Sequence, residues 1–311
     1  MESVLRLSGL TKNYGGIRAL DGVSMAIPQG AVFGLLGPNG SGKTTLLSLI
    51  TGLAHRTSGS FIWQSVPENT PSPDVAAIIE KPNFLPKLRA AEQLSHIARL
   101  RGLGEAHRRS EIPRLLEKVG LSQAADRPLQ AFSLGMKQRF GIAALLLSDP
   151  RVLILDEPTN GLDPQGIIEI RHLILQLAAE GRTIILASHL LDEVEKVCTH
   201  AAILKQGRLL DVREMRADSA GGSGEAAGML VELGVAPEQL PALFPLLDSF
   251  GAKPEAATGL LPGRVQVRLK PGADPAALNR FLSGHEIYLA HLQHVHDRLE
   301  TSFLKALENR P

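Results

Sequence analysis

The sequence has little cysteine and no long hydrophobic run. These two absences argue against a disulfide-stabilised protein and against a membrane-spanning one. Its 311 residues include a single cysteine, Cys198, which excludes an internal disulfide framework and fits a reducing compartment. A membrane-spanning helix needs about 18 or more consecutive apolar residues. The apolar runs at 143–148 and 152–156 are too short, and a charged, proline-containing stretch separates them. We therefore expect no segment of the chain to span a bilayer.

The chain also lacks a secretory leader and a strong net charge. Residues 1–10, MESVLRLSGL, have neither the basic start nor the apolar stretch of a signal peptide, so we expect the protein to stay inside the cell. A formal net charge of +1 provides no general field that would attract nucleic acid or acidic lipid. The composition, with 44% hydrophobic and 21% charged residues, is that of an ordinary globular protein. Charge therefore indicates no partner.

Length and pattern indicate a larger and a smaller domain. From residue 4 to about residue 215, short strands rich in Val, Ile and Leu alternate with helical segments, which predicts a parallel sheet covered on both faces. Residues 84–140 are helical without strands, which predicts a helical subdomain beside the sheet. Strands are expected at 4–10, 16–30, 31–37, 60–63, 75–80, 152–156, 183–188, 201–205 and 207–212, and helices at 43–53, 90–120, 134–148, 164–180 and 190–197.

A break in composition separates the second domain. Residues 217–228, ADSAGGSGEAAG, are small, polar and glycine-rich, as in a flexible linker. Residues 229–311 then suggest the order β-α-β-β-α-β plus a final helix at 298–309, which indicates a ferredoxin-like α+β domain. Within it, residues 237–247 are interpreted as a packed helix rather than a membrane-surface helix, although two internal prolines weaken that interpretation.

A glycine-rich segment predicts a phosphate-binding loop. GPNGSGKTT follows an apolar strand and opens a helix, which is the context that gives G-x-x-x-x-G-K-[ST] its meaning. The glycines let backbone N–H groups point at phosphate oxygens, and the helix N-terminus adds partial positive charge. Lys43 is expected to neutralise the β- and γ-phosphates, and Thr44 to place its hydroxyl on Mg²⁺. The loop comprises Gly37, Pro38, Asn39, Gly40, Ser41, Gly42, Lys43, Thr44 and Thr45.

VLILDEPTNGLDP, residues 152–164, predicts the acidic half of the site. Four apolar residues form a buried strand, so Asp156 emerges at the carboxyl edge, where open α/β sheets bind ligands. Such a carboxylate can hold Mg²⁺ directly or through water. The adjacent Glu157 is placed to orient and deprotonate an attacking water. Taken alone, the two acids could also merely end a strand and begin a turn, although the catalytic interpretation is already favoured; the phosphate loop strengthens it.

The order of these segments resembles the ATP-binding subunit of an ABC transporter. The phosphate loop is followed by SLGMKQR at 133–139, by DEPTNGLDP, and by Ser188–His189 after a strand. The likeness covers about residues 1–215. It implies an α/β fold of the P-loop NTPase, ABC ATPase type over residues 1–216, with a mostly parallel sheet, an antiparallel edge sheet and a helical subdomain.

The resemblance also implies roles for residues outside the loop. Tyr14 matches the aromatic residue that stacks on adenine, and His189 matches the switch histidine that contacts the γ-phosphate. Asp163 matches the loop that communicates between paired subunits. Ser133 and the backbone of Gly135 match the signature loop, which caps the nucleotide held by a second subunit. One chain would then provide only half of each site.

Two positions depart from the family pattern. The common signature is LSGGQ, whereas this chain has FSLGM, with Leu134 and Met136 at the third and fifth positions. The family usually places glutamine after the strand at 75–80, as a reversible Mg²⁺ ligand, and here that residue is Glu80. A carboxylate would hold the metal more strongly but add negative charge near the phosphates. Both departures resemble export-type ABC ATPases that include bacitracin- and multidrug-resistance systems.

The leading hypothesis is an ATP hydrolase that pairs around two Mg·ATP and drives export. The implied partners are separate transmembrane permease subunits and a second ATP-binding subunit, most simply a homodimer, with no nucleic acid. The implied location is the cytoplasmic face of the membrane, through the permease. Phe84 and Leu85 are candidate contacts with it, although a core position is equally compatible with either.

Two alternatives stay open at the level of sequence. One is an ABC ATPase that acts on ribosomes or nucleic acid, although such proteins usually have two nucleotide domains and basic arms. The other is a regulatory module in which the C-terminal domain binds a small ligand. Nothing in the sequence identifies the transported substrate.

Overall fold

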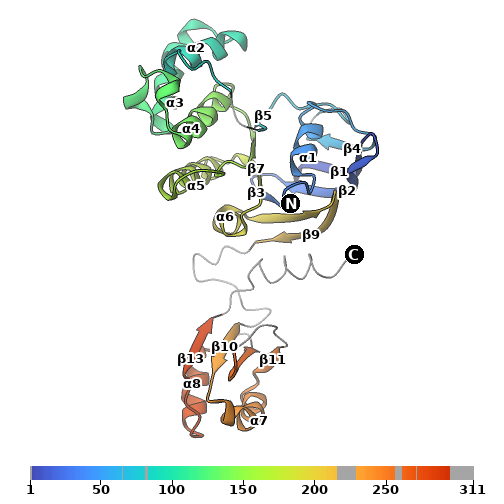
Figure 1. Ribbon diagram of the computed structural model, residues 1–311, viewed down its shortest axis with the longest axis vertical. Coiled ribbons are helices and arrows are strands. Elements are labelled where there is room, and N and C mark those ends of the chain that lie inside the picture. The colour runs from blue at the N-terminus through green and yellow to red at the C-terminus, as the bar shows by residue number, and fades with distance from the viewer. Residues whose placement is uncertain are drawn as a thin grey trace. The chain divides into compact units, whose positions relative to one another are not determined.

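The protein is described by a computed structural model over residues 2–64, 66–80, 83–215, 229–255, 261–270 and 272–294. The chain forms two compact units that divide after residue 216 (Figure 1). In the part of the chain that the structure describes, no helix is long and apolar enough to cross a membrane. The predicted linker at 217–228 and the predicted final helix at 298–309 lie outside the described residues.

The first unit is built on a six-stranded sheet in the order β5-β6-β7-β3-β8-β9, in which only β9 is antiparallel to its neighbour. Every residue of the three central strands is buried, so the sheet requires cover on both faces. Its strands are β3 (Val32–Leu36), β5 (Val75–Ile78), β6 (Val152–Asp156), β7 (Thr183–Ser188), β8 (His200–Lys205) and β9 (Arg208–Glu214).

A three-stranded antiparallel sheet, ordered β2-β1-β4, shares its core with the central sheet. The strands are β1 (Ser3–Tyr14), β2 (Ile17–Pro28) and β4 (Ser58–Trp63). Trp63 fills this core, and its indole N–H donates to the carbonyl of Ile50 at the end of α1 (Lys43–Ile50) at 2.9 Å. The helix that follows the phosphate loop is thereby anchored at its far end.

The remaining helices of the first unit are α4 (Leu134–Leu146), α5 (Pro164–Ala179) and α6 (Leu191–Val197), with α2 (Ala90–Leu100) and α3 (Glu105–Lys118) in the helical subdomain. Two 3-10 turns, Ser122–Ala124 and Leu129–Ala131, connect α3 to α4. Phe84 packs edge-on against Phe140 of α4, with ring centroids 4.8 Å apart. Leu85 instead remains 58% exposed.

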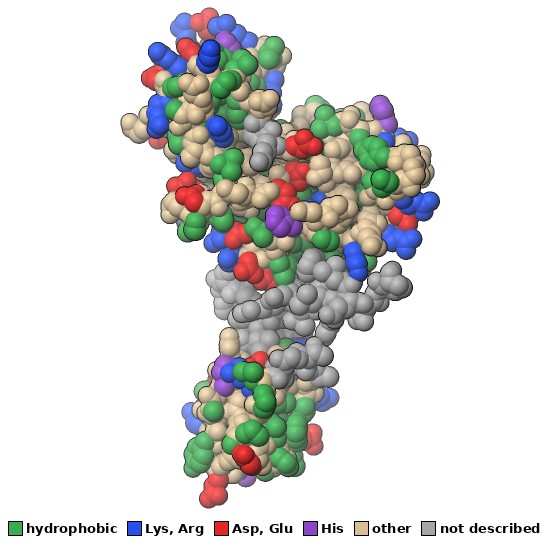
Figure 2. All heavy atoms as spheres, viewed as in Figure 1, with side chains coloured by type: hydrophobic (Ala, Val, Ile, Leu, Met, Phe, Trp, Pro, Cys, Tyr) green, Lys and Arg blue, Asp and Glu red, His purple; other side chains and the backbone are tan. Residues whose placement is uncertain are grey.

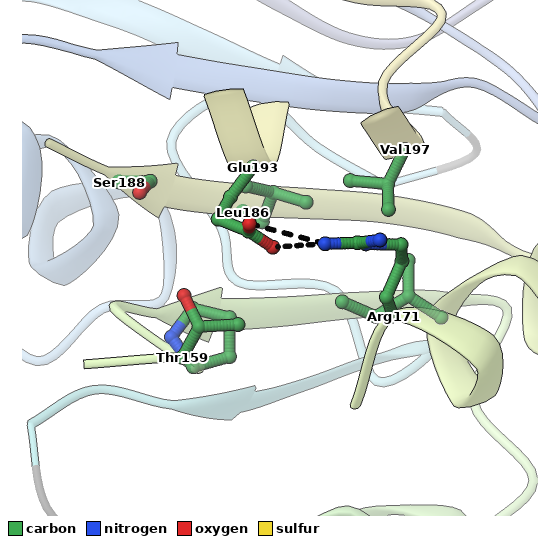
Figure 3. Close-up of a pocket in the computed structure, with 8 residues that line it drawn as sticks. Thr159, Arg171, Leu186, Ser188, Glu193 and Val197 are labelled. Carbon is green, nitrogen blue, oxygen red and sulfur yellow. Dashed lines mark hydrogen bonds and ion pairs between the residues drawn. The ribbon is translucent and has the colours of Figure 1, made fainter. Parts of the chain in front are cut away.

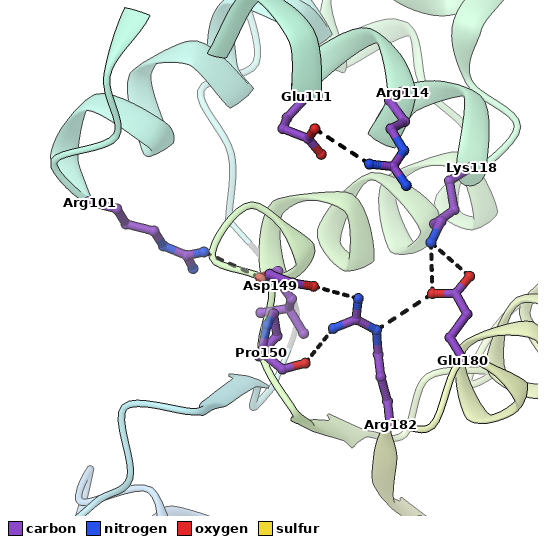
Figure 4. Close-up of polar contacts among 9 residues, drawn as sticks. Arg101, Glu111, Arg114, Lys118, Asp149, Pro150, Glu180 and Arg182 are labelled. Carbon is purple, nitrogen blue, oxygen red and sulfur yellow. Dashed lines mark hydrogen bonds and ion pairs between the residues drawn. The ribbon is translucent and has the colours of Figure 1, made fainter. Parts of the chain in front are cut away.

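Ion pairs tie the helical subdomain to the start of strands β6 and β7 (Figure 4). The guanidinium of Arg182 donates to the carbonyl of Pro150 and to Asp149, and it also lies 3.7 Å from Glu180. Lys118, the last residue of α3, completes the group at 2.7 Å from Glu180. This network lies at the edge of the sheet opposite to the carboxyl ends of the parallel strands.

The second unit is a four-stranded antiparallel sheet, ordered β11-β12-β10-β13, with two helices. Alternate residues of β10 and β12, among them Val231, Leu233 and Val267, join both helices in one core. The elements are β10 (Leu230–Gly234), a 3-10 turn (Pro237–Gln239), α7 (Leu240–Phe250), β11 (Lys253–Glu255), β12 (Arg264–Arg268), α8 (Pro275–Ser283) and β13 (His291–His294). Helix α7 forms despite Pro245, because its buried face carries Leu243 and Leu247.

The fold class predicted for the first unit is confirmed. The structure has the parallel sheet, the antiparallel edge sheet and the helical subdomain, and each predicted strand and helix occurs within a few residues of its expected position. The helix predicted at 43–53 ends earlier, at Ile50. The domain boundaries stay a prediction.

Candidate nucleotide-binding site

The phosphate loop connects β3 to α1 and depends on its glycines. Gly40 and Gly42 have φ values of 79° and 104°, a backbone region that strains other residues. A Cβ on Gly42 would lie 2.7 Å from the carbonyl oxygen of Ala19, and a Cβ on Gly37 would lie 2.3 Å from that of Leu204. The loop is therefore pressed against neighbouring backbone, and its shape requires glycine.

Lys43 is the buried cation of this loop. Its side chain is 6% exposed, and its ammonium donates to the carbonyl of Gly37 at 2.7 Å and to that of Pro38 at 3.3 Å. The same nitrogen lies 3.5 Å from Oε1 of Glu157. A buried charge is tolerated only when it is paired or hydrogen-bonded, and here both conditions hold. The positive charge is thus held inside the loop and beside the acids.

The side chains of Thr44, in α1, and Asp156, at the end of β6, are in contact. The Thr44 hydroxyl donates to Oδ2 of Asp156 at 2.7 Å. Burial is the main cause that raises the pKa of Asp156, and the negative charges of Glu157 and Glu80 add to it, against the opposing effects of Thr44 and Lys43. The other oxygen, Oδ1, is buried without a hydrogen-bond partner among the described residues. An unsatisfied buried carboxylate oxygen beside a hydroxyl suits a hard divalent cation.

Glu157 and His189 form the second polar contact. Nδ1 of His189 and Oε2 of Glu157 are 2.7 Å apart, although 32 residues separate them in the sequence. Glu157 has a φ of 50°, and its amide donates to the carbonyl of Ala187 at 3.0 Å, which fixes the turn after β6. Strain of this kind is concentrated at functional sites. Figure 2 shows acidic side chains and a histidine near the middle of this face of the first unit.

A second group of predicted residues gathers at the starts of α4 and α5, which lie side by side and away from α1 (Figure 1). Ser133 caps α4 by accepting from the amide of Met136 at 3.2 Å, and Asp163 caps α5 by accepting from the amide of Gly166 at 3.1 Å. A Cβ on Gly135 would meet only Gly166 and Leu162, at 3.7 and 3.9 Å. Packing within this chain therefore does not require glycine at position 135.

Tyr14 ends β1 with its side chain 50% exposed. Sequence reasoning missed its neighbour Lys12, whose ammonium lies 4.5 Å from the centre of the tyrosine ring and donates to the carbonyl of His55 at 2.6 Å. Residues i and i+2 of a strand face the same way, and that spacing was the available signal. One ring face of Tyr14 is thus occupied by a cation.

The structure brings together five of the residues predicted for catalysis and metal binding and leaves the others apart. Lys43, Thr44, Asp156, Glu157 and His189 form one connected cluster. Glu80, at a φ of 67°, contributes through its charge on Asp156. Ser133, Gly135 and Asp163 form a separate group. The glycine loop, buried lysine and acidic strand end define a P-loop protein that binds a nucleoside triphosphate.

Similarity to known proteins shows which family of P-loop proteins this chain belongs to. The family model described as ABC transporter matches residues 20–160. The lantibiotic transport ATP-binding protein SrtF of Streptococcus pyogenes is 42% identical over 68% of this chain and 91% of its own length. The bacitracin transport ATP-binding protein BcrA of Bacillus licheniformis is 41% identical over 68% of this chain and 70% of its own length.

A solved structure agrees with the sequence relatives. It is a dimeric, post-hydrolysis ATP-binding cassette bound to ADP and phosphate, with a TM-score of 0.61 and 25% identity, and the match covers 68% of this chain and 99% of the other. This chain therefore belongs to the ATP-binding proteins of the ABC transporter family. The predicted family membership is confirmed.

Proposed function

We propose that this chain hydrolyses ATP with Glu157 as the general base and so drives export through separate transmembrane subunits. The observation that carries the proposal is the position of the Glu157 carboxylate. One oxygen lies 3.5 Å from the Lys43 ammonium, and the other lies 2.7 Å from the ring nitrogen of His189. A base must lie within reach of the proton that it removes and be held in orientation by a neighbour.

The reaction is the attack of water on the γ-phosphorus. Glu157 accepts a proton from the water as the new O–P bond forms, and the bond between the γ-phosphorus and the bridging oxygen of ADP breaks. Lys43 neutralises charge on the phosphate oxygens. His189 holds Glu157 and contacts the γ-phosphate. Tyr14 stacks on the adenine through the face that Lys12 leaves open, which supplies affinity with little base discrimination.

The residues present fit Mg²⁺. Thr44, Asp156 and Glu80 would hold it, because these three residues offer a hydroxyl, a buried carboxylate with one unsatisfied oxygen, and a second carboxylate. When bound, the cation neutralises charge on the triphosphate. The negative charge of Glu80 beside Asp156 makes this site more acidic than the glutamine of the usual family pattern would.

The complete site requires two chains. A Cβ on Gly135 would make only ordinary contacts with Gly166 and Leu162, so packing within this chain does not explain the glycine, and the capping Ser133 at the start of α4 is exposed. Backbone N–H groups at a helix start attract phosphate. We infer that Ser133, Gly135 and Asp163 of one chain cap the ATP in the phosphate loop of a second copy, so that two Mg·ATP are enclosed between two chains.

The partner is a transmembrane permease, and this chain lies at the cytoplasmic face of the membrane by binding to it. Leu85 is a candidate contact because it is 58% exposed. Phe84 is instead engaged with Phe140 and is better explained by packing. The names of the relatives, which refer to transport of a lantibiotic and of bacitracin, support transport of a substrate by such a complex.

The decisive experiment compares the wild-type chain with Glu157→Gln. We expect turnover of Mg·ATP to fall by about 1,000-fold, within the range for loss of a general base, while ATP-dependent dimers persist in size-exclusion chromatography. Wild-type turnover should also rise more steeply than linearly with protein concentration. Full turnover by Glu157→Gln, or full turnover by a strictly monomeric wild-type chain, would contradict the proposal.

A copurification experiment separates the transporter from the alternative. The tagged chain should recover an integral membrane protein from detergent-solubilised membranes. Recovery of ribosomes or nucleic acid without any integral membrane protein would instead favour the ABC ATPase that acts on ribosomes or DNA.

A further inference from the structure

An ion pair joins α5 and α6, the helices that follow the turns after β6 and β7 (Figure 3). Arg171 of α5 donates from Nη2 to both carboxylate oxygens of Glu193 on α6, at 3.1 Å each. Both side chains are mostly buried, at 22% and 15% exposure. Exposed ion pairs contribute little, but a charge that is mostly buried and loses its partner is costly. Glu193 also lies 3.6 Å from Lys196 of its own helix, so of these two contacts the one with Arg171 links α5 to α6.

The link lies close to the proposed catalytic residues in the chain. Helix α5 starts at its cap, Asp163, and α6 starts at Leu191, two residues after His189. Helix α6 has seven residues and no side-chain hydrogen bond at its N-cap. Short helices depend on tertiary contacts for their position. The direction in which α6 leaves β7 therefore depends on what α6 packs against.

Contacts with β3 hold α6 on one side. A Cβ on Gly34 would lie 2.6 Å from Cγ1 of Val194 and 3.0 Å from Sγ of Cys198, so α6 is seated closely on the sheet. On the other side, a small cavity of about 10 Å³ separates it from α5 and from the turns after β6 and β7. Thr159 and Ser188 line this cavity together with the ion pair.

On the side toward α5, apolar packing and the ion pair together support α6, because Ile174, Leu186 and Val197 also line the cavity. A volume of about 10 Å³ is at the lower limit for one water molecule, so no side chain fills the space. The Arg171 guanidinium and the Glu193 carboxylate cross this region instead. Loss of either partner leaves the other charge uncompensated between α5 and α6, and we expect α6 to shift and to carry His189 with it.

We propose that Arg171 and Glu193 are positioning residues that fix His189 against Glu157 for hydrolysis. The inference rests on the proposed roles of Glu157 and His189. Among the described residues, neither Arg171 nor Glu193 forms a hydrogen bond or ion pair with the phosphate loop. A displacement of about 1 Å at a catalytic group is enough to cost up to 100-fold in rate. The pair should thus affect the chemical step and leave ATP binding nearly unchanged.

The test measures kcat and the Kd for ATP in full-length Arg171→Met, Glu193→Gln and the double variant. We expect kcat to fall about tenfold in each single variant, with the Kd for ATP within twofold of wild type. Because both residues act through one contact, the double variant should lose no more than a single one. Glu193→Gln is nearly isosteric, so it keeps the test meaningful even if Arg171→Met fails to fold.

A matched control removes a different ion pair, located at the C-terminal end of α5. Lys118→Met breaks the contact with Glu180, beyond the far end of α5, and we expect its kcat to stay within twofold. Glu157→Gln, measured in parallel, distinguishes the two proposals. If Glu157→Gln is inactive but Arg171→Met and Glu193→Gln keep kcat within twofold, the positioning role is wrong and the catalytic proposal stands. Multiplying losses in the double variant, or a Kd that weakens in proportion to kcat, would also overturn the positioning role.

Discussion

The phosphate-loop cluster (Lys43, Thr44, Asp156, Glu157 and His189) and the α4–α5 group (Ser133, Gly135 and Asp163) are built differently, although both are proposed to bind ATP. In the phosphate-loop cluster, Lys43, Asp156 and Glu157 are bonded to other members of the same cluster. In the α4–α5 group, the hydrogen bonds of Ser133 and Asp163 with other described residues all go to the first turns of their own helices. The phosphate-loop cluster is preassembled within one chain. The helix starts of the α4–α5 group form no comparable contacts with other described residues.

The glycines express the same difference. Around Gly37 and Gly42 an added Cβ would collide with backbone, whereas at Gly135 it would meet only ordinary van der Waals contacts. A glycine that the chain's own packing requires is explained by folding. A glycine in a helix that costs about 1 kcal/mol and is not required for packing calls for an external reason, and a nucleotide held by a second copy provides one.

The largest expected effect comes from removing the buried cation. Lys43→Ala leaves Asp156 and Glu157 without the ammonium that lies between the loop carbonyls and Glu157, so the acids would repel the triphosphate. We expect the Kd for ATP to rise at least 100-fold, measured with a fluorescent ATP analogue. Lys137→Ala on α4 is the matched control and should leave the Kd of the monomeric chain within twofold. Unchanged affinity in Lys43→Ala would contradict the phosphate-loop assignment.

Gly37→Ala should harm folding itself. Its Cβ would lie 2.3 Å from the Leu204 carbonyl oxygen and 2.5 Å from Oγ of Ser41, and a backbone atom cannot yield as a flexible side chain can. Overpacking of this kind costs about 2 kcal/mol. We expect the free energy of unfolding to fall by that amount in urea denaturation. A variant as stable as wild type would show that the loop is less tightly packed than the structure indicates.

Gly135→Ala should lower turnover without lowering the stability of the fold. Its Cβ has room, and alanine favours the helix, so the melting temperature should stay constant or rise slightly. Turnover at saturating ATP should nevertheless fall about tenfold, because alanine restricts the backbone at the start of α4, which in the proposed cap must adjust to reach the phosphates of the partner's nucleotide. Normal turnover with normal stability would remove Gly135 from the proposed cap.

The sequence predicted the central elements of the first unit well because the three central strands of its sheet are wholly buried. Runs such as VLILD at 152–156 and TIILAS at 183–188 permit almost no other interpretation. The glycine loop and Asp156 were predictable for a related reason, since their chemistry depends on neighbours in the sequence. Position relative to a strand end is local information.

The contacts that connect distant segments were not predictable in this way. The sequence alone does not show that Glu157 meets His189, or that Arg171 meets Glu193 22 residues later. The position of Phe84 is a similar case, because whether it faces Phe140 or the outside depends on how α4 packs. Such pairings follow from the tertiary fold, and the residue types at each position are compatible with many others.

The smallest expected effect on folding stability concerns the cost of burying the ionised Asp156 in the absence of a cation. Because burial raises the pKa of Asp156, its ionised form is less favourable in the folded chain than in the unfolded one. This cost is absent below the unfolded value, about 3.9, and grows as the pH rises through the folded value. Asp156→Asn should therefore stabilise the nucleotide-free protein by about 1 kcal/mol, more at pH 8 than at pH 4.5, while Mg²⁺-dependent turnover is lost. The exposed Glu68→Gln serves as the control and should change neither quantity. If Asp156→Asn instead lowers the melting temperature at pH 8, the hydrogen bond from Thr44 outweighs the burial cost, and the carboxylate stabilises the site rather than straining it.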